Sequence, residues 1–304
     1  MADDAPALIA LDWGTSTLRA YLLDGAGRIL EAAAEGPGAA ELGAGGFAPA
    51  HAAATGAWRA RWPGLRALAS GMVGSNVGWV EAPYVACPAS VEALAGALVP
   101  TPGDGPLIVP GVIQREGLAN VMRGEETQIL GALCLHPGLR ARARLALPGT
   151  HSKWAELREG RITGFDTFMT GELYAVLRAH SILGRLAKAE PAPAAARAAF
   201  ERGVRSMGGP LALRLFSARA LVVAGEMAAE DSLEYLSGLL IGDELRGAGA
   251  VPDALVGEPG LCARYQSAME ALGLDAPPII DAAEATTAGL FHIAQQAGLT
   301  GGSR

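Results

Sequence analysis

A polar turn near the start of the chain carries residues that can bind phosphate. Asp12 ends an apolar run, and Gly14, Thr15 and Ser16 follow closely. The glycine lets the backbone approach a ligand, while successive N–H groups and hydroxyls can donate to phosphate oxygens. The carboxylate of Asp12 can hold Mg²⁺, because that ion prefers oxygen ligands and keeps some of its waters. The alternative is an ordinary strand and turn with a capping Asp.

A second turn of the same kind occurs about one domain length later. The Gly-Thr pair at 149–150 is followed by His151, Ser152 and Lys153, one of only two lysines in the chain. Both Gly-Thr pairs stand between an apolar strand and a second strand, and a glycine turn with Arg-Ile comes next in each case. This order predicts an internal repeat of a β-hairpin unit. Chance similarity between glycine-rich hairpins, and a solvated surface role for Lys153, are the alternatives.

Two adjacent carboxylates could serve as a general base. Glu125 and Glu126 follow Arg123-Gly124 and open an expected helix over 124–135. A positioned carboxylate can accept the proton of a hydroxyl nucleophile. Successive helix residues point about 100° apart, so only one of the two can face a given site. Glu125 is the first candidate and Glu126 the second, and the alternative is that both only favour the positive end of the helix.

A glycine-flanked polar loop over 70–81 is suited to a polar substrate, because it combines free N–H groups with polar side chains. Trp79 within it is equally suited to a core position. For Thr170, at the start of an expected helix, the alternative is that it is only a helix cap. The candidate substrate contacts are Gly74, Ser75, Asn76, Trp79, Glu81, Arg123, Thr170 and Glu172.

The apolar spacing and the turn residues predict the elements that position these groups. In the first half we expect strands over 7–13, 17–24, 65–70 and 106–110, a short strand from Arg28, and helices over 47–62, 89–98 and 124–135. From 143 the second hairpin follows, then helices over 171–183, 194–206, 231–247, 259–272 and 283–298, with strands within 251–260 and 277–281. Strands that alternate with helices in both halves predict an α/β fold with mixed sheets.

Composition excludes several classes of protein. The 304 residues carry 24 Lys and Arg against 31 Asp and Glu, a net charge of −7, and 50% are hydrophobic. This chain is too apolar for a disordered protein, and without a basic run it does not favour nucleic acid as a partner. No apolar stretch reaches the roughly 18 residues of a membrane span, and the start lacks the positive charge of a signal peptide, so we expect a cytoplasmic protein. Three distant cysteines predict neither disulfides nor a zinc site.

Several segments together have the pattern of a known family. They are LDWGTSTLRAYLLD, ASGMVGSNVGWVEAPY, VPGV, VMRGEETQILGAL, LPGTHSKW, FMTGELYAVLRAHSIL and YLSGLLIGDEL, in this order along the chain. With them the chain resembles the 2-dehydro-3-deoxygalactonokinase family of the actin/hexokinase/heat-shock ATPase superfamily. The resemblance implies two ribonuclease H-like domains with mixed sheets flanked by helices around a central cleft. It also implies transfer of phosphate from ATP to the 6-hydroxyl of a 2-keto-3-deoxy sugar acid, a reaction that depends on positioning and charge neutralisation.

The resemblance also assigns roles to residues. Asp12 would hold Mg²⁺, Glu125 or Glu126 would act as base, and Lys153 would neutralise phosphate charge or reach the sugar acid. Pro148 departs from the superfamily, since many members have Asp there, and a metal role for the second turn is therefore in doubt. The expected ATP contacts are Gly14, Thr15, Ser16, Gly149, Thr150, His151 and Ser152 for the phosphates, with Gly225 and Gly257 for adenosine.

Two domains are expected, residues 1–141 for the first phosphate turn and the sugar acid, and 142–304 for the second turn and adenosine. The final helix, 284–298, is free to pack back on the first domain. The partners are then a sugar acid and ATP, with no nucleic acid and no membrane, and association into a homodimer is left open. The alternatives are a kinase of the same fold that acts on 2-keto-3-deoxygluconate or another sugar, and a non-metabolic ATPase of the superfamily.

Overall fold

The computed structural model describes residues 5–43, 45–187 and 189–300. The chain forms two compact units. Unit 1 comprises Met1–Ala143, Ala155–Phe165 and Ile280–Arg304, and unit 2 comprises Arg144–Trp154 and Asp166–Ile279. The first crossing from unit 1 to unit 2 lies beside the boundary expected after residue 141. Two later segments return to unit 1, and one of them contains the last helix.

The main sheet of unit 1 is mixed. β1 pairs antiparallel with β2 and parallel with β5, so polar and apolar residues of β1 are held between two neighbours. β5 continues the parallel pairing to β8, and β4 (Gly36–Pro37) pairs with β2 at the side. The order across the sheet is β3 (Ile29–Ala32), β2 (Thr17–Asp24), β1 (Pro6–Trp13), β5 (Ala67–Ser70), β8 (Leu107–Ile108) and β7 (Val99–Pro100).

A second sheet repeats this order, which confirms the predicted hairpin repeat. Its third, second and first strands lie side by side and are followed by later strands, two here and three in the main sheet of unit 1. β11 pairs parallel with β14, just as β1 pairs with β5. The order is β13 (Arg161–Phe168), β12 (Ser152–Arg158), β11 (Arg142–Leu147), β14 (Ala254–Gly257) and β15 (Ile279–Asp281).

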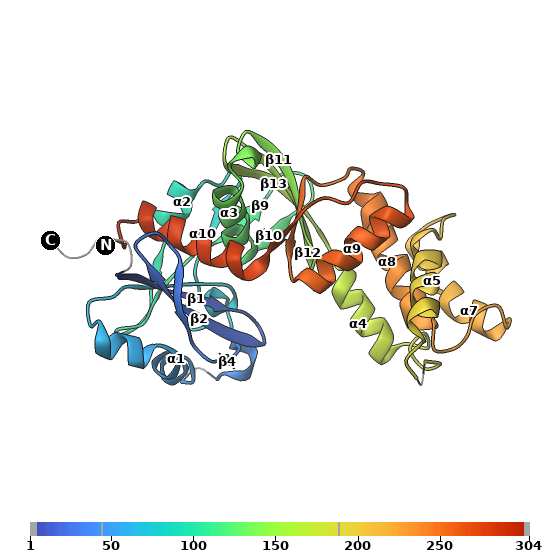
Figure 1. Cartoon of the computed structure of the whole chain (residues 1–304), viewed down its shortest axis with the longest axis horizontal. Coiled ribbons are helices and arrows are strands. Elements are labelled where there is room, and N and C mark those ends of the chain that lie inside the picture. The colour runs from blue at the N-terminus through green and yellow to red at the C-terminus, as the bar shows by residue number, and fades with distance from the viewer. Residues whose placement is uncertain (1–4, 44, 188, 301–304) are drawn as a thin grey trace. The chain divides into compact units, whose positions relative to one another are not determined.

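Helices cover the main sheet of unit 1. α10 packs against α3, α2 and β1, and Figure 1 shows it running alongside α3. The two helices approach closely because glycines face each other: a β-carbon at Gly131 would overlap the carbonyl oxygen of Ala285, and one at Gly289 that of Thr127. The helices are α1 (Phe47–Arg61), α2 (Val91–Ala95), α3 (Glu125–Leu135) and α10 (Ala282–Gln296), with short 3-10 turns at Ala39–Glu41, Met72–Gly74 and Pro137–Leu139.

In unit 2 a single long helix is the centre of the helical layer. α8 (Ser232–Ala248) packs against every other helix of the unit, most extensively against α5 (Figure 1). Its Ile241 and Leu245 join Trp154 and Tyr265 in one buried cluster, and its Leu236 and Leu239 belong to another. The remaining helices are α4 (Thr170–His180), α5 (Pro193–Val204), α6 (Leu211–Leu215), α7 (Ser217–Val223) and α9 (Pro259–Ala271).

The sequence did not predict every element. β6 (Tyr84–Ala86), β9 (Gly111–Gln114) and β10 (Asn120–Met122) form a three-stranded sheet in regions without an assigned strand. Each is only three or four residues long, too short for an alternating pattern to be visible. β4 and the 3-10 turn at Ala39–Glu41 lie where no element was expected, and α6 and α7 were also missed. No helix among the described residues has both the length and the apolar character needed to cross a bilayer.

Candidate active site

Asp12 stands near the carboxyl end of β1, at the centre of the main sheet. It lies opposite Arg19 on β2 and opposite Ser70 at the end of β5. Arg19 Nη1 is 3.9 Å from Asp12 Oδ2, while Arg19 Nε donates to Glu35 at 2.8 Å. The Asp12 side chain is 26% exposed, and burial raises its pKa, an effect that Arg19 partly opposes. A partly buried carboxylate with only one distant cation beside it suits a divalent cation, which would offset the cost of burying its charge.

The first Gly-Thr turn (Gly14–Ser16) leaves its side chains at the surface. Gly14 N–H donates to the Thr17 carbonyl at 2.9 Å, which closes the hairpin between β1 and β2. The carbonyl groups of Gly14 and Thr15 accept from Ala39 and Ala40 at 3.0 Å each, so the 3-10 turn braces the back of the loop. Thr15 and Ser16 are exposed. Their hydroxyls therefore remain accessible to a phosphate.

The polar loop after β5 and the start of α3 meet beside this turn. A β-carbon at Gly71 (φ +96°) would lie 2.8 Å from the Trp13 carbonyl oxygen, and one at Gly124 would lie 3.4 Å from Gly71 Cα. At Gly71 a β-carbon would come too close to Trp13, and at Gly124 the positive φ of +106° favours glycine. The structure therefore brings together Asp12, the loop over 70–81 and the two glutamates of α3, all within unit 1.

The two glutamates differ in exposure. Glu126 is fully buried, and its carboxylate accepts from Gly124 N–H at 2.7 Å and from the Thr127 hydroxyl at 3.0 Å. Burial, together with the charge of Glu125, raises the pKa of Glu126 to about 7. Glu125 is half-buried, and one of its oxygens accepts from Arg123 N–H at 3.0 Å. Glu125 is thus the member of the pair that a substrate can reach.

The Arg123 side chain packs against the polar loop. Its Nη2 donates to the Ala82 carbonyl at 2.8 Å, and its guanidinium stacks 4.4 Å from the centre of the Tyr84 ring. Its Nε and Nη1 are buried and have no hydrogen-bond partner among the described residues. A β-carbon at Gly74 would lie 3.0 Å from Nη1. Arg123 therefore brings two unsatisfied donors to the loop, a costly arrangement that a bound anion would relieve.

The other residues expected at the substrate differ in their exposure to solvent. Asn76 and Glu81 are exposed, whereas Ser75 is buried and accepts from Val77 N–H at 3.3 Å. Trp79 packs in an aromatic cluster whose ring centres lie 6.1 Å from Trp13 and 6.2 Å from Phe47. These aromatic contacts fit the alternative that Trp79 is a core residue.

In unit 2, the second Gly-Thr turn (Gly149–His151) follows β11. Thr150 and His151 are exposed, but Ser152 is fully buried and Lys153 is 4% exposed. Ser152 Oγ lies 3.4 Å from Gly149 N and 3.0 Å from the Tyr265 hydroxyl, and Lys153 Nζ donates to the His151 carbonyl at 3.1 Å. Ser152 and Lys153 therefore hold the turn from inside, while Gly149, Thr150 and His151 present its outer edge.

The start of α4 packs directly on this turn. A β-carbon at Gly171 would lie 2.5 Å from the Gly149 carbonyl oxygen, and Glu172 N–H donates to the Thr150 carbonyl at 3.0 Å. The Glu172 carboxylate pairs with His151, and Thr170 is buried with its hydroxyl on Glu244. Thr170 and Glu172, expected at the substrate, are thus both engaged with the second turn or its support.

A cavity of about 650 Å³ opens beside the second turn, entirely within unit 2. Leu240, Ile241 and Leu261 supply apolar surface. Arg264 crosses one wall, where it donates to Ser237 Oγ at 3.0 Å and to Glu234 at 2.6 Å. This volume and this mixture of apolar and polar groups are typical of a small-molecule site. A purine nucleoside with its phosphates toward Gly149 and Thr150 matches the volume of the cavity and the mixed character of its walls.

Sequence reasoning located this cavity only in part. Gly257 ends β14 beside the second turn, since its added β-carbon would lie 3.6 Å from the Pro148 carbonyl oxygen. Gly225 follows α7 and is not among the lining residues. Glu234, Ser237 and Arg264 were not singled out. A signal existed for Glu244, which falls at the buried spacing of Leu236 and Leu240 on α8.

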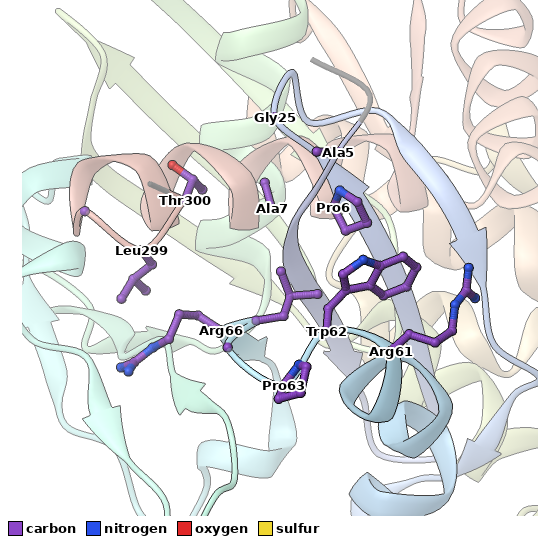
Figure 2. A pocket seen from close by; sticks show the side chains of 13 residues that line it. Ala5, Pro6, Ala7, Gly25, Arg61, Trp62, Pro63, Arg66, Leu299 and Thr300 are labelled. Carbon is purple, nitrogen blue, oxygen red and sulfur yellow. The ribbon is translucent and has the colours of Figure 1, made fainter. Parts of the chain in front are cut away.

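A larger cavity, of about 790 Å³, lies at the other end of β1 (Figure 2). It is lined by Pro6 at the start of that strand, by Arg61, Trp62 and Arg66, and by Leu299 after α10. Arg61 is already paired with Glu31 at 2.7 Å. In α/β sheets ligands bind beyond the carboxyl ends of the parallel strands, and Asp12 stands at that end. We therefore assign the chemistry to the Asp12 end.

Comparison with known proteins identifies the family. The family model described as 2-keto-3-deoxy-galactonokinase matches residues 12–293. The 2-dehydro-3-deoxygalactonokinase of Escherichia coli (strain K12) is 39% identical over 275 residues, which cover 88% of this chain and 90% of that protein. A crystal structure of a candidate 2-dehydro-3-deoxygalactonokinase from Sinorhizobium meliloti has a TM-score of 0.80 and 36% identity, and covers 95% of this chain and 98% of that one.

A more distant structure extends the comparison of the fold. The activator of the 2-hydroxyisocaproyl-CoA dehydratase from Clostridium difficile, with bound ADPNP, has a TM-score of 0.51 at 10% identity. The match covers 96% of this chain and 95% of that one. At this identity the likeness concerns the fold alone.

Proposed function

Because the chain belongs to the 2-keto-3-deoxy-galactonokinase family, we propose that it phosphorylates 2-dehydro-3-deoxy-D-galactonate. The γ-phosphoryl group of ATP passes to the 6-hydroxyl, and the products are the 6-phosphate, ADP and the proton of that hydroxyl. The observation that carries the proposal is the meeting of Asp12, the polar loop and Glu125 at one end of the main sheet. This reaction belongs to D-galactonate catabolism in the cytoplasm.

In the proposed mechanism, Glu125 accepts the proton of the 6-hydroxyl as that oxygen attacks phosphorus. Its partial exposure supports this role, and the complete burial of Glu126 counts against the neighbour. Asp12 would hold Mg²⁺, which neutralises negative charge on the phosphates when it is bound. Among the residues described, no three His, Cys, Asp or Glu side chains gather into a metal site. A single carboxylate that shares Mg²⁺ with water and the nucleotide is a common arrangement for this ion.

Phosphate binding is assigned to the two Gly-Thr turns. Thr15 and Ser16 in the first turn, and Gly149 and Thr150 in the second, present accessible donors for phosphate oxygens. The adenosine moiety occupies the 650 Å³ cavity, whose wall includes the second turn. Ser152 and Lys153 keep the turn in shape, and the positive charge of Lys153 contributes to the local field.

The sugar acid is assigned to the polar loop over 70–81. Its carboxylate and keto group need donors, and its hydroxyls need polar partners. Arg123 supplies two buried donors without a partner in the described structure, and Ser75 and Asn76 lie on the loop that Arg123 supports. Binding there requires the loop to open a path to Arg123, since both nitrogens are shielded from solvent.

Turnover on a panel of substrates tests the proposal. ADP release is measured with Mg-ATP and 2-keto-3-deoxygalactonate, 2-keto-3-deoxygluconate, galactonate, glucose or N-acetylglucosamine. We expect turnover confined to the 2-keto-3-deoxy acids and lost in Asp12→Ala. Turnover on glucose or N-acetylglucosamine alone would refute the carboxylate site around Arg123. ATP binding without turnover on any of them would favour another substrate or a non-metabolic ATPase.

A further inference from the structure

A buried carboxylate lies behind the second Gly-Thr turn and takes no part in the mechanism described above. Glu244, on α8, is 2% exposed and does not line the nucleotide cavity. Three donors meet on it. Trp154 Nε1 donates to Oε1 at 2.8 Å, the Tyr265 hydroxyl donates to Oε2 at 2.7 Å, and the Thr170 hydroxyl also donates to Oε2. They come from β12, α9 and α4, so one side chain joins three elements to α8.

The direction of these hydrogen bonds is fixed by the inventory of protons. Burial raises the pKa of Glu244, and the hydrogen bonds that its carboxylate accepts oppose this shift. In the ionised form the carboxylate only accepts, so the single proton of the Tyr265 hydroxyl is used on Glu244. Ser152 Oγ, 3.0 Å from that hydroxyl oxygen, must then donate to Tyr265. The Ser152 oxygen is left to accept from Gly149 N–H at 3.4 Å. A one-way chain of donors therefore runs from the second Gly-Thr turn to Glu244.

A second route joins Glu244 to the same turn. Thr170, which donates to Glu244, is the first residue of α4. The next residue, Gly171, packs on Gly149, and the N–H of the residue after it donates to the Thr150 carbonyl at 3.0 Å. The carboxylate is therefore connected to the turn by two routes, one through Tyr265 and Ser152 and the other through the start of α4.

We propose that Glu244 is a positioning residue that sets the shape of the second Gly-Thr turn for the phosphates of the nucleotide. The inference rests on the proposed function, because it assigns that turn to ATP. Glu244 touches neither the cavity nor the surface, so it can affect the nucleotide only through Tyr265, Ser152 and Thr170. A carboxylate buried without such donors would be strongly unfavourable, and with them it orders four segments in one geometry.

Binding of ADP in the absence of sugar acid, measured by calorimetry, tests the proposal. Glu244→Gln keeps the shape but replaces one acceptor oxygen with a donor, so one of the three donors loses its acceptor. Tyr265→Phe removes the link to Ser152 and leaves Trp154 and Thr170 on Glu244. It also changes a residue that lines the cavity, whereas Glu244→Gln changes one that does not. We expect each variant to bind ADP about 10-fold more weakly, the size expected for one buried hydrogen bond. The KM for ATP should rise by a similar factor while the KM for the sugar acid stays unchanged.

Tyr235→Phe is the matched control. Tyr235 is also a buried tyrosine of unit 2, and its hydroxyl lies 2.8 Å from Ser217 Oγ, but it does not line the nucleotide cavity. Loss of the Tyr235 hydroxyl should leave the affinity for ADP unchanged. Melting temperatures of all variants separate a loss of stability from a loss of binding.

A double-mutant cycle of Ser152→Ala and Tyr265→Phe tests the chain itself. If the two residues act along one path, the double variant binds ADP no more weakly than the worse single variant. Fully additive losses would contradict the chain, as would lowered melting temperatures with unchanged ADP affinity. If Glu244→Gln does not fold, the double-mutant cycle still tests whether Ser152 and Tyr265 act along one path. Wild-type protein that binds ADP but phosphorylates no sugar acid would refute the proposed substrate and leave this comparison of affinities intact.

Discussion

At the scale of single residues, two adjacent glutamates have opposite surroundings. Helix geometry alone predicts that only one of Glu125 and Glu126 can face a site, but it cannot say which. Packing decides the matter, because Glu126 is among the buried residues of α3 and Glu125 is not. Burial of a charged side chain depends on distant segments, and this is why the choice could not be derived from the local sequence.

Replacement of Glu125 by Gln tests its role as the base. The amide keeps an acceptor for Arg123 N–H but cannot take a proton, so we expect kcat to fall by about 10²–10⁴-fold. The KM for ATP should change little. Glu270→Gln, an exposed glutamate on α9, serves as the control and should retain full activity. A Glu125→Gln enzyme with near-normal kcat would remove Glu125 from the mechanism.

Glu126 should make stability depend on pH. Its pKa is about 7 in the folded protein and near 4.5 when unfolded, so the folded state favours the protonated form. Its contribution is therefore neutral below pH 4.5 and increasingly destabilising as the pH rises toward 7. Between pH 5 and 8 the unfolding free energy of the wild type should fall, relative to Glu126→Gln, by on the order of 2 kcal/mol. Urea unfolding at several pH values measures this, and parallel curves for the two proteins would contradict it.

At the scale of elements, the hairpin repeat was predictable because it is local. An apolar strand, a Gly-Thr turn, a second strand and a glycine turn are adjacent in sequence, and the two copies share one strand order. The three-stranded sheet of β6, β9 and β10 was not predictable, because its strands are short and pair across long intervals. The cavity that we assign to the nucleotide was predicted only in part. Its walls come from α4, α8 and α9, and no local pattern shows which of their faces meet.

The contact between α4 and the second Gly-Thr turn gives a prediction about Gly171. Alanine there would place a methyl group 2.5 Å from the Gly149 carbonyl oxygen and 2.8 Å from Thr150 Cα, so the backbone must move. We expect Gly171→Ala to weaken ADP binding by about 10-fold or more, equivalent to about 1.4 kcal/mol. Gly56→Ala in α1 is the control, since no atom lies within 4 Å of its added β-carbon.

The control variant has an expected effect of its own. Alanine favours a helix interior over glycine, so Gly56→Ala should raise the unfolding free energy by about 0.5–1 kcal/mol and leave ADP binding unchanged. If Gly171→Ala also bound ADP normally, the second turn would be less sensitive to α4 than the packing indicates. Calorimetry and urea unfolding on the two variants provide both measurements.

At the scale of the whole molecule, the proposed roles divide between the two units. The metal ligand and the base belong to unit 1, and the nucleotide cavity belongs to unit 2. This division predicts that catalysis and nucleotide binding can be separated by mutation. Asp12→Asn should lower kcat by at least about 100-fold, because charge on the phosphates is no longer neutralised as the reaction requires. ADP affinity measured without Mg²⁺ should stay within about two-fold of wild type.

The same experiment can contradict the division. An equal loss of ADP affinity in Asp12→Asn without Mg²⁺ would mean that Asp12 acts on the nucleotide cavity itself. Restoration of Asp12→Asn activity by an excess of Mg²⁺ would instead support a weakened ion site, since a neutral amide oxygen is a poorer ligand than a carboxylate.

The close crossing of α3 and α10 bears on how the protein is made. A ribosome emits α3 long before α10, and at about 5–20 residues per second the delay is roughly ten seconds or more. During that interval the face of α3 that carries Thr127 and Gly131 lacks the helix that packs on it in the finished protein. The helix that carries Glu125 therefore acquires its final support last. A nascent chain that already contains all of unit 2 still lacks this support, because α10 follows the last residue of that unit.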